Sequence, residues 1–270
     1  MRVGFYQFAP VFGDVAGNVG RAREGLSALE ADLIVLPELF NTGYQFVSEG
    51  EVQELAEPVP GGETCEALVD LAQKRRTHIV AGLAERDGDQ IFNTCVLVGP
   101  EGSIGRYRKL HLFYEEKRWF RPGEEPPPVL DVGGVKLGLM VCFDWIFPET
   151  ARMLALQGAD ILCHPANLIY TLCHKAMVVR CIENRVFAVT CNRTGQDARK
   201  PDETLTYTGG SQVVDPRGEI LVRAGPEEAE GRVVDIHPER SRNKDLNEYN
   251  NLVRDRRVEI YEMLSRPVVS

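Results

Sequence analysis

The chain has 270 residues and carries a formal net charge of −9, with a sequence pI near 5.2. Such an acidic chain lacks the basic surface that phosphate contacts need, so its composition argues against a nucleic-acid-binding protein. A hydrophobic fraction of 43% supplies enough apolar material for a sizeable core. We therefore expect an α/β protein that folds as one domain over residues 1–270.

No apolar run approaches the length of a membrane span, and the first residues alternate like a strand rather than a secretory segment. The seven cysteines are an odd number without a Cys-x-x-Cys pair, which is typical of free thiols in a reducing compartment. We expect a cytoplasmic protein without a membrane partner. The dipeptide Cys163-His164 is not a good metal site, because neighbours on a strand point to opposite faces.

The first part of the chain alternates strand-like and helix-like patterns. Residues 32–36, Asp-Leu-Ile-Val-Leu, form an apolar run that is typical of a strand buried on both faces. This run ends at Pro37-Glu38, so we expect Glu38 at the carboxyl edge of a sheet, where the ligands of open α/β sheets collect. The expected strands here are 2–8, 32–36, 78–85, 91–98 and 103–109, and the expected helices are 18–30 and 64–76.

Residues 40–60 interrupt that alternation with Asn, Gly and Pro residues and are predicted to form a long loop. Long loops in compact domains are often functional, so Phe40, Tyr44 and Phe46 are candidates for lining a pocket. The alternative is that these aromatic side chains cover the edge of the core.

Two similar turns, Gly99-Pro-Glu-Gly102 and Val214-Asp-Pro-Arg-Gly218, connect apolar strands in different parts of the chain. They suggest two similar halves whose sheets stack face to face, joined through the proline-rich segment 122–128. The expected strands of the second half are 129–132, 136–141, 160–163, 186–191, 211–214 and 219–222, and the expected helices are 148–157, 172–185 and 253–264.

Cys142 ends the apolar run at 136–141, and Pro148-Glu149 begins the next helix. The cysteine is therefore predicted at a strand-to-helix turn, close to a helix N-terminus that would favour the thiolate. The alternative is a buried cysteine that only fills space. A second loop, residues 164–168, is expected at the same edge of the sheet.

Glu38, Lys109 and Cys142 place a carboxylate, an ammonium and a thiol at predicted strand ends. If they converge, Lys109 can favour the thiolate and then stabilise a tetrahedral oxyanion, while Glu38 accepts and donates protons. That set is sufficient for acyl transfer. Taken singly, Lys109 is also compatible with a solvated strand residue.

Three motifs resemble those of the nitrilase superfamily, the carbon-nitrogen hydrolases. They are Pro37-Glu-Leu-Phe40, Tyr107-Arg-Lys-Leu-His111 and Cys142-Phe-Asp-Trp-Ile-Phe-Pro-Glu149, in the order and spacing of the family. The resemblance covers nearly the whole chain, including the Asn167 loop and residues 243–257. It implies a four-layer αββα sandwich that pairs into a homodimer and uses neither a metal nor an organic cofactor.

By this resemblance Cys142 is the nucleophile, Glu38 the general base and Lys109 the oxyanion stabiliser. Members also carry a second glutamate shortly after the lysine, for which we choose Glu116 and keep Glu115 as the alternative.

The resemblance further implies that the main-chain N–H of Phe143 is a second oxyanion donor. Tyr44, Phe113, Trp145 and Asn167 would shape the pocket for the acyl group.

The implied reaction is hydrolysis of the carbon-nitrogen bond of a small aliphatic amide, giving a carboxylic acid and ammonia through a cysteine thioester. A nitrilase acting through a thioimidate and an N-carbamoyl amine hydrolase are alternatives with the same residues. Outside this scheme, a papain-like pair of Cys142 and His164 is conceivable. A binding module without catalysis is the remaining class, because a fold does not guarantee a function.

Overall fold

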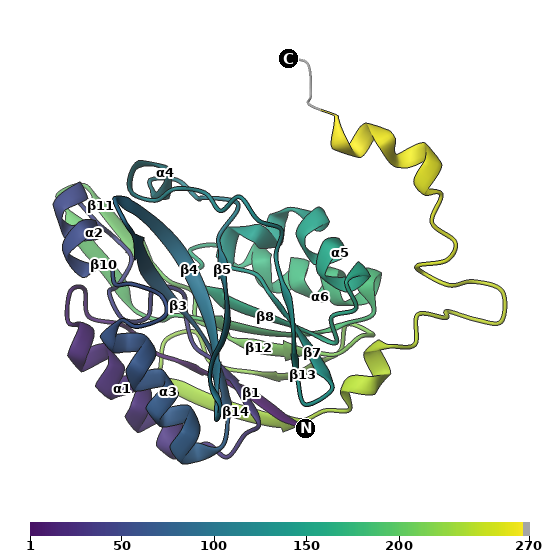
Figure 1. Ribbon diagram of the computed structural model, residues 1–270, viewed down its shortest axis with the longest axis horizontal. Coiled ribbons are helices and arrows are strands. Elements are labelled where there is room, and N and C mark those ends of the chain that lie inside the picture. Colours follow the sequence, from purple (N-terminus) through teal and green to yellow (C-terminus); the bar gives the residue numbers. More distant parts are fainter. Residues whose placement is uncertain (267–270) are drawn as a thin grey trace.

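The computed structural model describes residues 1–266. Two six-stranded sheets face each other, and helices cover the outer face of each sheet (Figure 1). The layers therefore follow the order helix, sheet, sheet, helix. The α/β class and the four-layer αββα sandwich expected from the sequence are confirmed.

The first sheet has the strand order β14-β1-β2-β3-β4-β5, in which β1, β2 and β3 are parallel. Its helices pack on the sheet through Ala22, Leu26 and Leu68, which form one apolar cluster with the strand residues Ile34 and Ile79. The strands are β1 (Arg2–Gln7), β2 (Leu33–Val35), β3 (His78–Asp87), β4 (Gln90–Gly99), β5 (Gly102–Arg108) and β14 (Glu230–Asp235), and the helices are α1 (Val15–Ser27) and α3 (Glu63–Arg75).

The second sheet has the order β13-β12-β9-β8-β7-β6, with β7, β8 and β9 parallel. One core cluster contains Val35 and Leu97 of the first sheet together with Leu139 and Leu162 of the second, so the two sheets share it. The strands are β6 (Val129–Val132), β7 (Val135–Leu139), β8 (Ile161–Ala166), β9 (Phe187–Asn192), β12 (Gln212–Val214) and β13 (Ile220–Arg223), and the helices are α5 (Pro148–Leu156) and α6 (Leu172–Asn184).

Two expectations for the first part of the chain need correction. Helix α1 begins earlier than expected, because the side chain of Asp14 accepts a hydrogen bond from the Gly17 N–H and caps the helix. The expected loop 40–60 contains a helix, α2 (Glu49–Leu55), whose N-terminus is capped in the same way by Ser48.

Strand β8 continues through residues that were expected to form a loop, 164–166. Beyond Cys163 only β9 still pairs with β8, so Pro165 lies where the loss of an N–H is tolerated. The sequence patterns also missed β14, which pairs with β1, the short helix α4 (Glu116–Trp119), and the two-stranded hairpin of β10 (Gln196–Lys200) and β11 (Glu203–Thr206).

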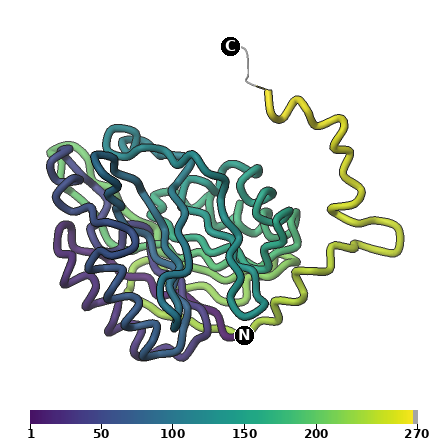
Figure 2. The backbone as a smooth tube through the Cα atoms, viewed as in Figure 1, coloured from purple at the N-terminus to yellow at the C-terminus, as the bar shows by residue number. Residues whose placement is uncertain are grey.

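The predicted final helix, 253–264, is wrong. Part of this segment forms a 3-10 helix, η3 (Val258–Ser265), in which every side chain is exposed. A second 3-10 helix, η2 (Pro238–Ser241), precedes the segment. Without an apolar surface to pack against, a segment of this length gains little from an α-helical conformation. After η2, Lys244 still donates to the Asn184 and Arg185 carbonyls, and the chain beyond it leaves the body as an arm (Figure 2). Within residues 1–266 there is no helix long and apolar enough to cross a membrane.

Candidate active site

Glu38 lies just beyond the end of β2, and its side chain is fully buried. The main chain on either side of it is held by Gly82 of β3, which donates to the Pro37 carbonyl and accepts from the Phe40 N–H. Gly82 must be a glycine, because a Cβ atom there would lie 2.6 Å from the Glu38 Cα. The Glu38 Oε1 accepts hydrogen bonds from Asn93 Nδ2 and Lys109 Nζ, both at 2.7 Å.

Lys109 follows β5, and its ammonium group is completely buried. Its Nζ donates to Glu38 Oε1 at 2.7 Å and to Glu116 Oε1 at 2.8 Å. The lysine therefore bridges two carboxylates from distant parts of the chain. A buried cation of this kind is stable only when such partners compensate its desolvation.

Glu116, at the start of α4, is buried, and its Oε1 also accepts a 2.7 Å hydrogen bond from the Tyr44 hydroxyl. Glu115 instead forms ion pairs with Lys200 and Arg118 near the surface. Of the two candidates for the second glutamate, Glu116 is the one that contacts Lys109.

Cys142 is buried and begins a short 3-10 helix, η1 (Cys142–Ile146), with a φ of +39°. A positive φ is uncommon at a residue other than glycine and is a strained conformation that recurs at functional sites. Asp144 holds the turn, because its Oδ2 accepts hydrogen bonds from the Val141 N–H and from the Tyr107 hydroxyl, both at 2.9 Å. Its Oδ1 contacts His111 Nδ1 at 2.7 Å, so Asp144 joins the cysteine motif to the lysine motif.

His164 contacts the main chain of Cys142 rather than its sulfur. The His164 Nε2 donates to the Cys142 carbonyl at 2.9 Å, since a carbonyl can only accept, and Nδ1 lies 3.1 Å from the Thr190 hydroxyl. Burial lowers the pKa of His164 to about 4, so the ring is neutral near pH 7. Both ring nitrogens are occupied away from the thiol, which does not support a papain-like pair.

Asn167 follows β8 and is buried next to the cysteine, whose Sγ donates to the Asn167 carbonyl at 3.9 Å. Its side-chain Nδ2 and Oδ1 are buried without a hydrogen-bond partner in the part of the chain that the structure describes. Glu38 Oε2 and Glu116 Oε2 likewise have none within residues 1–266. Buried polar atoms are rarely left unpaired, so these atoms are candidates for contact with a bound molecule.

The chain matches the family model described as carbon-nitrogen hydrolase over residues 2–244. It is 44% identical to a nitrilase from Pyrococcus abyssi over 97% of this chain and 99% of that one. The chain belongs to the carbon-nitrogen hydrolases of the nitrilase superfamily. The enzyme is also 36% identical to an (R)-stereoselective amidase from Pseudomonas sp, over 84% of this chain and 82% of that one.

A solved structure of similar fold is a mutant amidase from Nesterenkonia sp. AN1, with covalent addition of the acetamide moiety of fluoroacetamide at its active-site cysteine. It is 28% identical to this hydrolase, covers 97% of this chain and 95% of its own, and superimposes with a TM-score of 0.79.

The thiol of this hydrolase is not activated by a helix terminus as expected from the sequence. Burial raises the pKa of Cys142 well above its usual value, and the nearby Glu38 carboxylate raises it further, while Lys109 acts in the opposite direction. The five-residue η1 separates the sulfur from α5, which begins only at Pro148. A thiol with a raised pKa is protonated at neutral pH, so Cys142 would need a base in order to act as a nucleophile.

The charges of the hydrolase site favour an ammonium at Lys109. Burial by itself would lower the pKa of Lys109, but the Glu116 and Glu38 carboxylates outweigh it and raise the pKa above its usual value. Burial raises the pKa of Glu116 to about 7, against the opposing effect of Lys109. Glu116 thus titrates close to neutral pH in the resting enzyme.

The aromatic candidates divide between the core and the site. Phe40 and Phe46 are buried in separate apolar clusters, as the alternative interpretation expected, whereas Tyr44 reaches Glu116. Phe113 packs on Phe143, with ring centroids 5.0 Å apart.

Trp145, another predicted pocket residue, is partly buried and packs against the core shared by the sheets. Asn93 was missed, although it contacts Glu38 directly. The available signal was its position as a polar residue within the apolar run of β4.

Proposed function

We propose that the enzyme hydrolyses the carbon-nitrogen bond of a small aliphatic carboxamide, giving a carboxylic acid and ammonia through a thioester on Cys142. The observation that carries this proposal is the buried ammonium of Lys109, held by two carboxylates whose charges also act on the neighbouring Cys142 thiol. A cation in a site of low dielectric stabilises a developing oxyanion far more strongly than one in water.

In the first half of the reaction, Glu38 takes the thiol proton through its unpaired Oε2 while Sγ bonds to the amide carbon. The carbonyl oxygen becomes an oxyanion, which Lys109 Nζ and the main-chain N–H of Phe143 stabilise. The proton on Glu38 passes to the leaving nitrogen, the carbon-nitrogen bond breaks, and ammonia departs from the thioester.

In the second half, Glu38 removes a proton from water, and the hydroxide adds to the thioester carbon. The carbon-sulfur bond then breaks, the acid leaves, and the proton returns to the Cys142 thiolate. Glu116 and Tyr44 keep the Lys109 ammonium in place throughout both steps. Asn167, Phe113 and Trp145 are proposed to shape the pocket for the acyl group.

Mass spectrometry tests the covalent intermediate. A slowly hydrolysed amide is mixed with the enzyme, and the reaction is quenched with acid and digested. We expect an acyl adduct on the peptide that contains Cys142, and none in Cys142→Ala. Ammonia release by Cys142→Ala at the wild-type rate, without an adduct in either protein, would remove the proposal.

Nitrile hydrolysis is the second candidate function, and the 44% identical relative named nitrilase favours it. The same residues would act, but the covalent intermediate would be a thioimidate. Parallel reactions with propionamide, glutaramate, an N-carbamoyl amine and fumaronitrile, followed by liquid chromatography, separate the candidates. Acid formed fastest from propionamide supports the amidase, whereas fastest turnover of fumaronitrile supports the nitrilase.

We also propose that the enzyme is one domain that forms a homodimer. Apolar side chains that are exposed in the single chain support this proposal, because a second copy could cover them. They are Val179 and Ile182 on α6 and Tyr249, Ile260 and Leu264 on the arm. Light scattering should give twice the chain mass for the wild type and a smaller mass for Val179→Glu combined with Ile182→Glu. A wild-type monomer would contradict this. The seven free thiols support a cytoplasmic location.

A further inference from the structure

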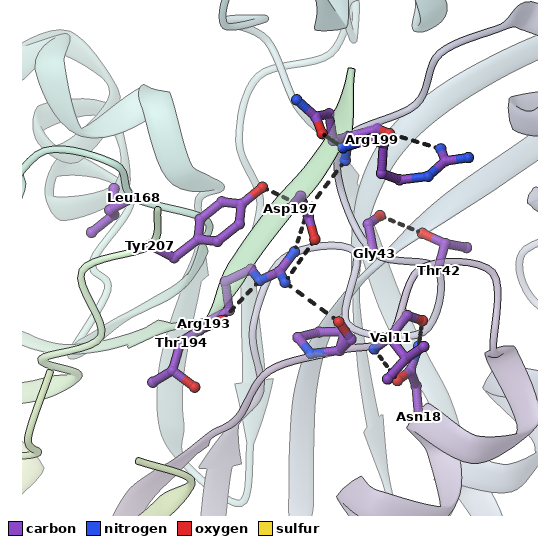
Figure 3. A network of polar contacts seen from close by, with 12 residues as sticks. Val11, Asn18, Thr42, Gly43, Leu168, Arg193, Thr194, Asp197, Arg199 and Tyr207 are labelled. Atoms are coloured by element: carbon purple, nitrogen blue, oxygen red, sulfur yellow. Dashed lines mark hydrogen bonds and ion pairs between the residues drawn. The ribbon is translucent and has the colours of Figure 1, made fainter. Parts of the chain in front are cut away.

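Arg193 and Asp197 form a buried ion pair at one side of the proposed site (Figure 3). Arg193 follows β9 and is 1% exposed, while Asp197 lies in β10 and is 5% exposed. Two parallel hydrogen bonds join them, from Nη1 to Oδ2 at 2.8 Å and from Nη2 to Oδ1 at 3.1 Å. This bidentate geometry fixes the orientation of both side chains.

Tyr207 completes this network. Its ring lies beneath the Arg193 guanidinium, with 3.9 Å between the guanidinium carbon and the ring centroid, and its hydroxyl donates to Asp197 Oδ2 at 2.8 Å. Figure 3 shows this hydroxyl pointing at the Asp197 carboxylate. The phenol is thus held from its face and from its oxygen, which leaves it little freedom to move.

The network reaches the proposed site through Tyr44. The rings of Tyr207 and Tyr44 meet edge to face, with centroids 6.2 Å apart and planes at 81°. Asp197 also accepts a 3.3 Å hydrogen bond from the N–H of Gln45, the residue after Tyr44. The Asp197 carboxylate therefore holds Tyr44 in two ways. It fixes Tyr207, whose ring packs against the Tyr44 ring, and it accepts a hydrogen bond from the main chain directly after Tyr44.

The position of Tyr44 matters because its hydroxyl donates to Glu116 Oε1, the same oxygen that accepts from Lys109. A buried ion pair adds little net stability to a fold. Stabilisation of the β10–β11 hairpin therefore does not explain why Arg193 and Asp197 are paired in a buried position. A fully bonded polar network does hold its members rigidly, and catalytic groups need such support.

We propose that Arg193, Asp197 and Tyr207 are positioning residues that fix the Tyr44 hydroxyl on Glu116 and thereby orient Lys109. This inference rests on the proposed function of Lys109 as the oxyanion stabiliser. None of the three residues acts on substrate directly, so their effect passes through Tyr44.

A double-mutant cycle of Tyr44→Phe and Tyr207→Phe tests that route. Each variant loses only one hydroxyl, and we expect each to lower kcat for the amide by roughly three- to tenfold with little change in KM. If Tyr207 acts through Tyr44, Tyr207→Phe has almost no effect in the Tyr44→Phe background. Effects that multiply in the double variant, or a Tyr207→Phe enzyme with wild-type kcat, overturn the proposal. Tyr6→Phe, a hydroxyl loss at a half-buried tyrosine elsewhere, is the matched control.

A second readout is independent of the substrate, namely the rate of Cys142 alkylation by iodoacetamide as a function of pH. Glu116 faces Lys109, Glu38, Tyr44 and the Cys142 thiol. Without the Tyr44 hydrogen bond, the pKa of Glu116 rises, so near pH 7 more of this carboxyl group is protonated and a negative charge that raises the pKa of the thiol is lost. Alkylation should then shift toward faster modification near pH 7, and its rate should match that of the wild type at alkaline pH, where Glu116 is ionised in both proteins.

We expect the same shift in Tyr44→Phe, Tyr207→Phe and the double variant, and none in Tyr6→Phe. A Tyr207→Phe profile that superimposes on the wild type, while Tyr44→Phe shifts, overturns the positioning role. Because alkylation needs no turnover, it tests the network even if the wild type hydrolyses no amide, an outcome that would contradict only the proposed function.

Discussion

Glu38, Lys109 and Glu116 come from the first half of the chain and bind one another, whereas Cys142 and Asn167 come from the second half and are bound more loosely. On the first side the lysine ammonium already lies between two carboxylates at 2.7 and 2.8 Å. On the second side the thiol makes one long contact, and both polar atoms of the Asn167 side chain are unpaired within residues 1–266.

This difference indicates a division of labour in the proposed site. The first side is an electrostatic unit that is organised before substrate binds, so the reaction need not reorganise it. The second side holds polar groups that have no protein partner within residues 1–266 and are therefore available to a substrate. Changes on the first side should therefore affect stability and activity together, and changes on the second should affect activity alone.

Lys109→Met should have the largest combined effect. It removes the cation that stabilises the oxyanion, so we expect kcat to fall by roughly 10³-fold. It also leaves two buried carboxylates without a cation, which should lower the free energy of unfolding by about 3–5 kcal/mol. Urea denaturation measures the second effect. Cys142→Ala is the control, which should be at least as inactive and yet close to the wild type in stability.

Glu38→Gln separates proton transfer from charge pairing. The amide oxygen can still accept from Asn93 and Lys109, so the loss of stability should be smaller than in Lys109→Met. Without a base, kcat should fall by about 10²-fold or more. A Glu38→Gln enzyme with the kcat of the wild type would mean that Glu38 is not the base for the thiol.

Asn167→Ala examines the second side. We expect kcat/KM to fall roughly 5- to 30-fold, because the substrate loses about 1–2 kcal/mol of hydrogen bonding. The melting temperature should stay near that of the wild type, since the side chain has no partner of its own within residues 1–266. A large drop in melting temperature with normal kinetics would contradict the comparison.

The pH profile should show the smallest effect. Glu116, with a pKa of about 7, is ionised above that pH. The ionised carboxylate accepts hydrogen bonds from Lys109 and Tyr44 more strongly than the protonated carboxyl group does. Activity should therefore fall on acidification, to roughly a third between about pH 7.5 and 6.5 for a single titrating group. In Glu116→Gln this limb should disappear, and an unchanged limb would assign it to another group.

The sequence was informative wherever the position of a residue in a strand, helix or turn depends on its near neighbours along the chain. Glu38, Lys109 and Cys142 could be placed at strand ends because the apolar runs before them are short and clear. Asn93 could not be assigned, since its partner Glu38 lies far away in the sequence. Arg193 and Asp197 are near neighbours along the chain, but their contact with the segment of Tyr44 joins residues that are remote in the sequence.

The protonation of Cys142 was predicted in the wrong direction for a similar reason. A helix N-terminus can be read from nearby residues, but desolvation and the charge of Glu38 depend on what surrounds the sulfur in space. The arm after η2 shows the converse, because its apolar spacing suggested a helix that no packing surface stabilises within residues 1–266.

The amino-acid sequence by itself determined most of the alternation of strands and helices, because that depends on local periodicity, and its three motifs carried the resemblance that implied the αββα sandwich. The tertiary structure alone decided that Glu116 rather than Glu115 contacts Lys109, that β14 joins β1, and that the thiol is protonated at rest. Each of these depends on distance and burial, which arise only when remote segments pack together.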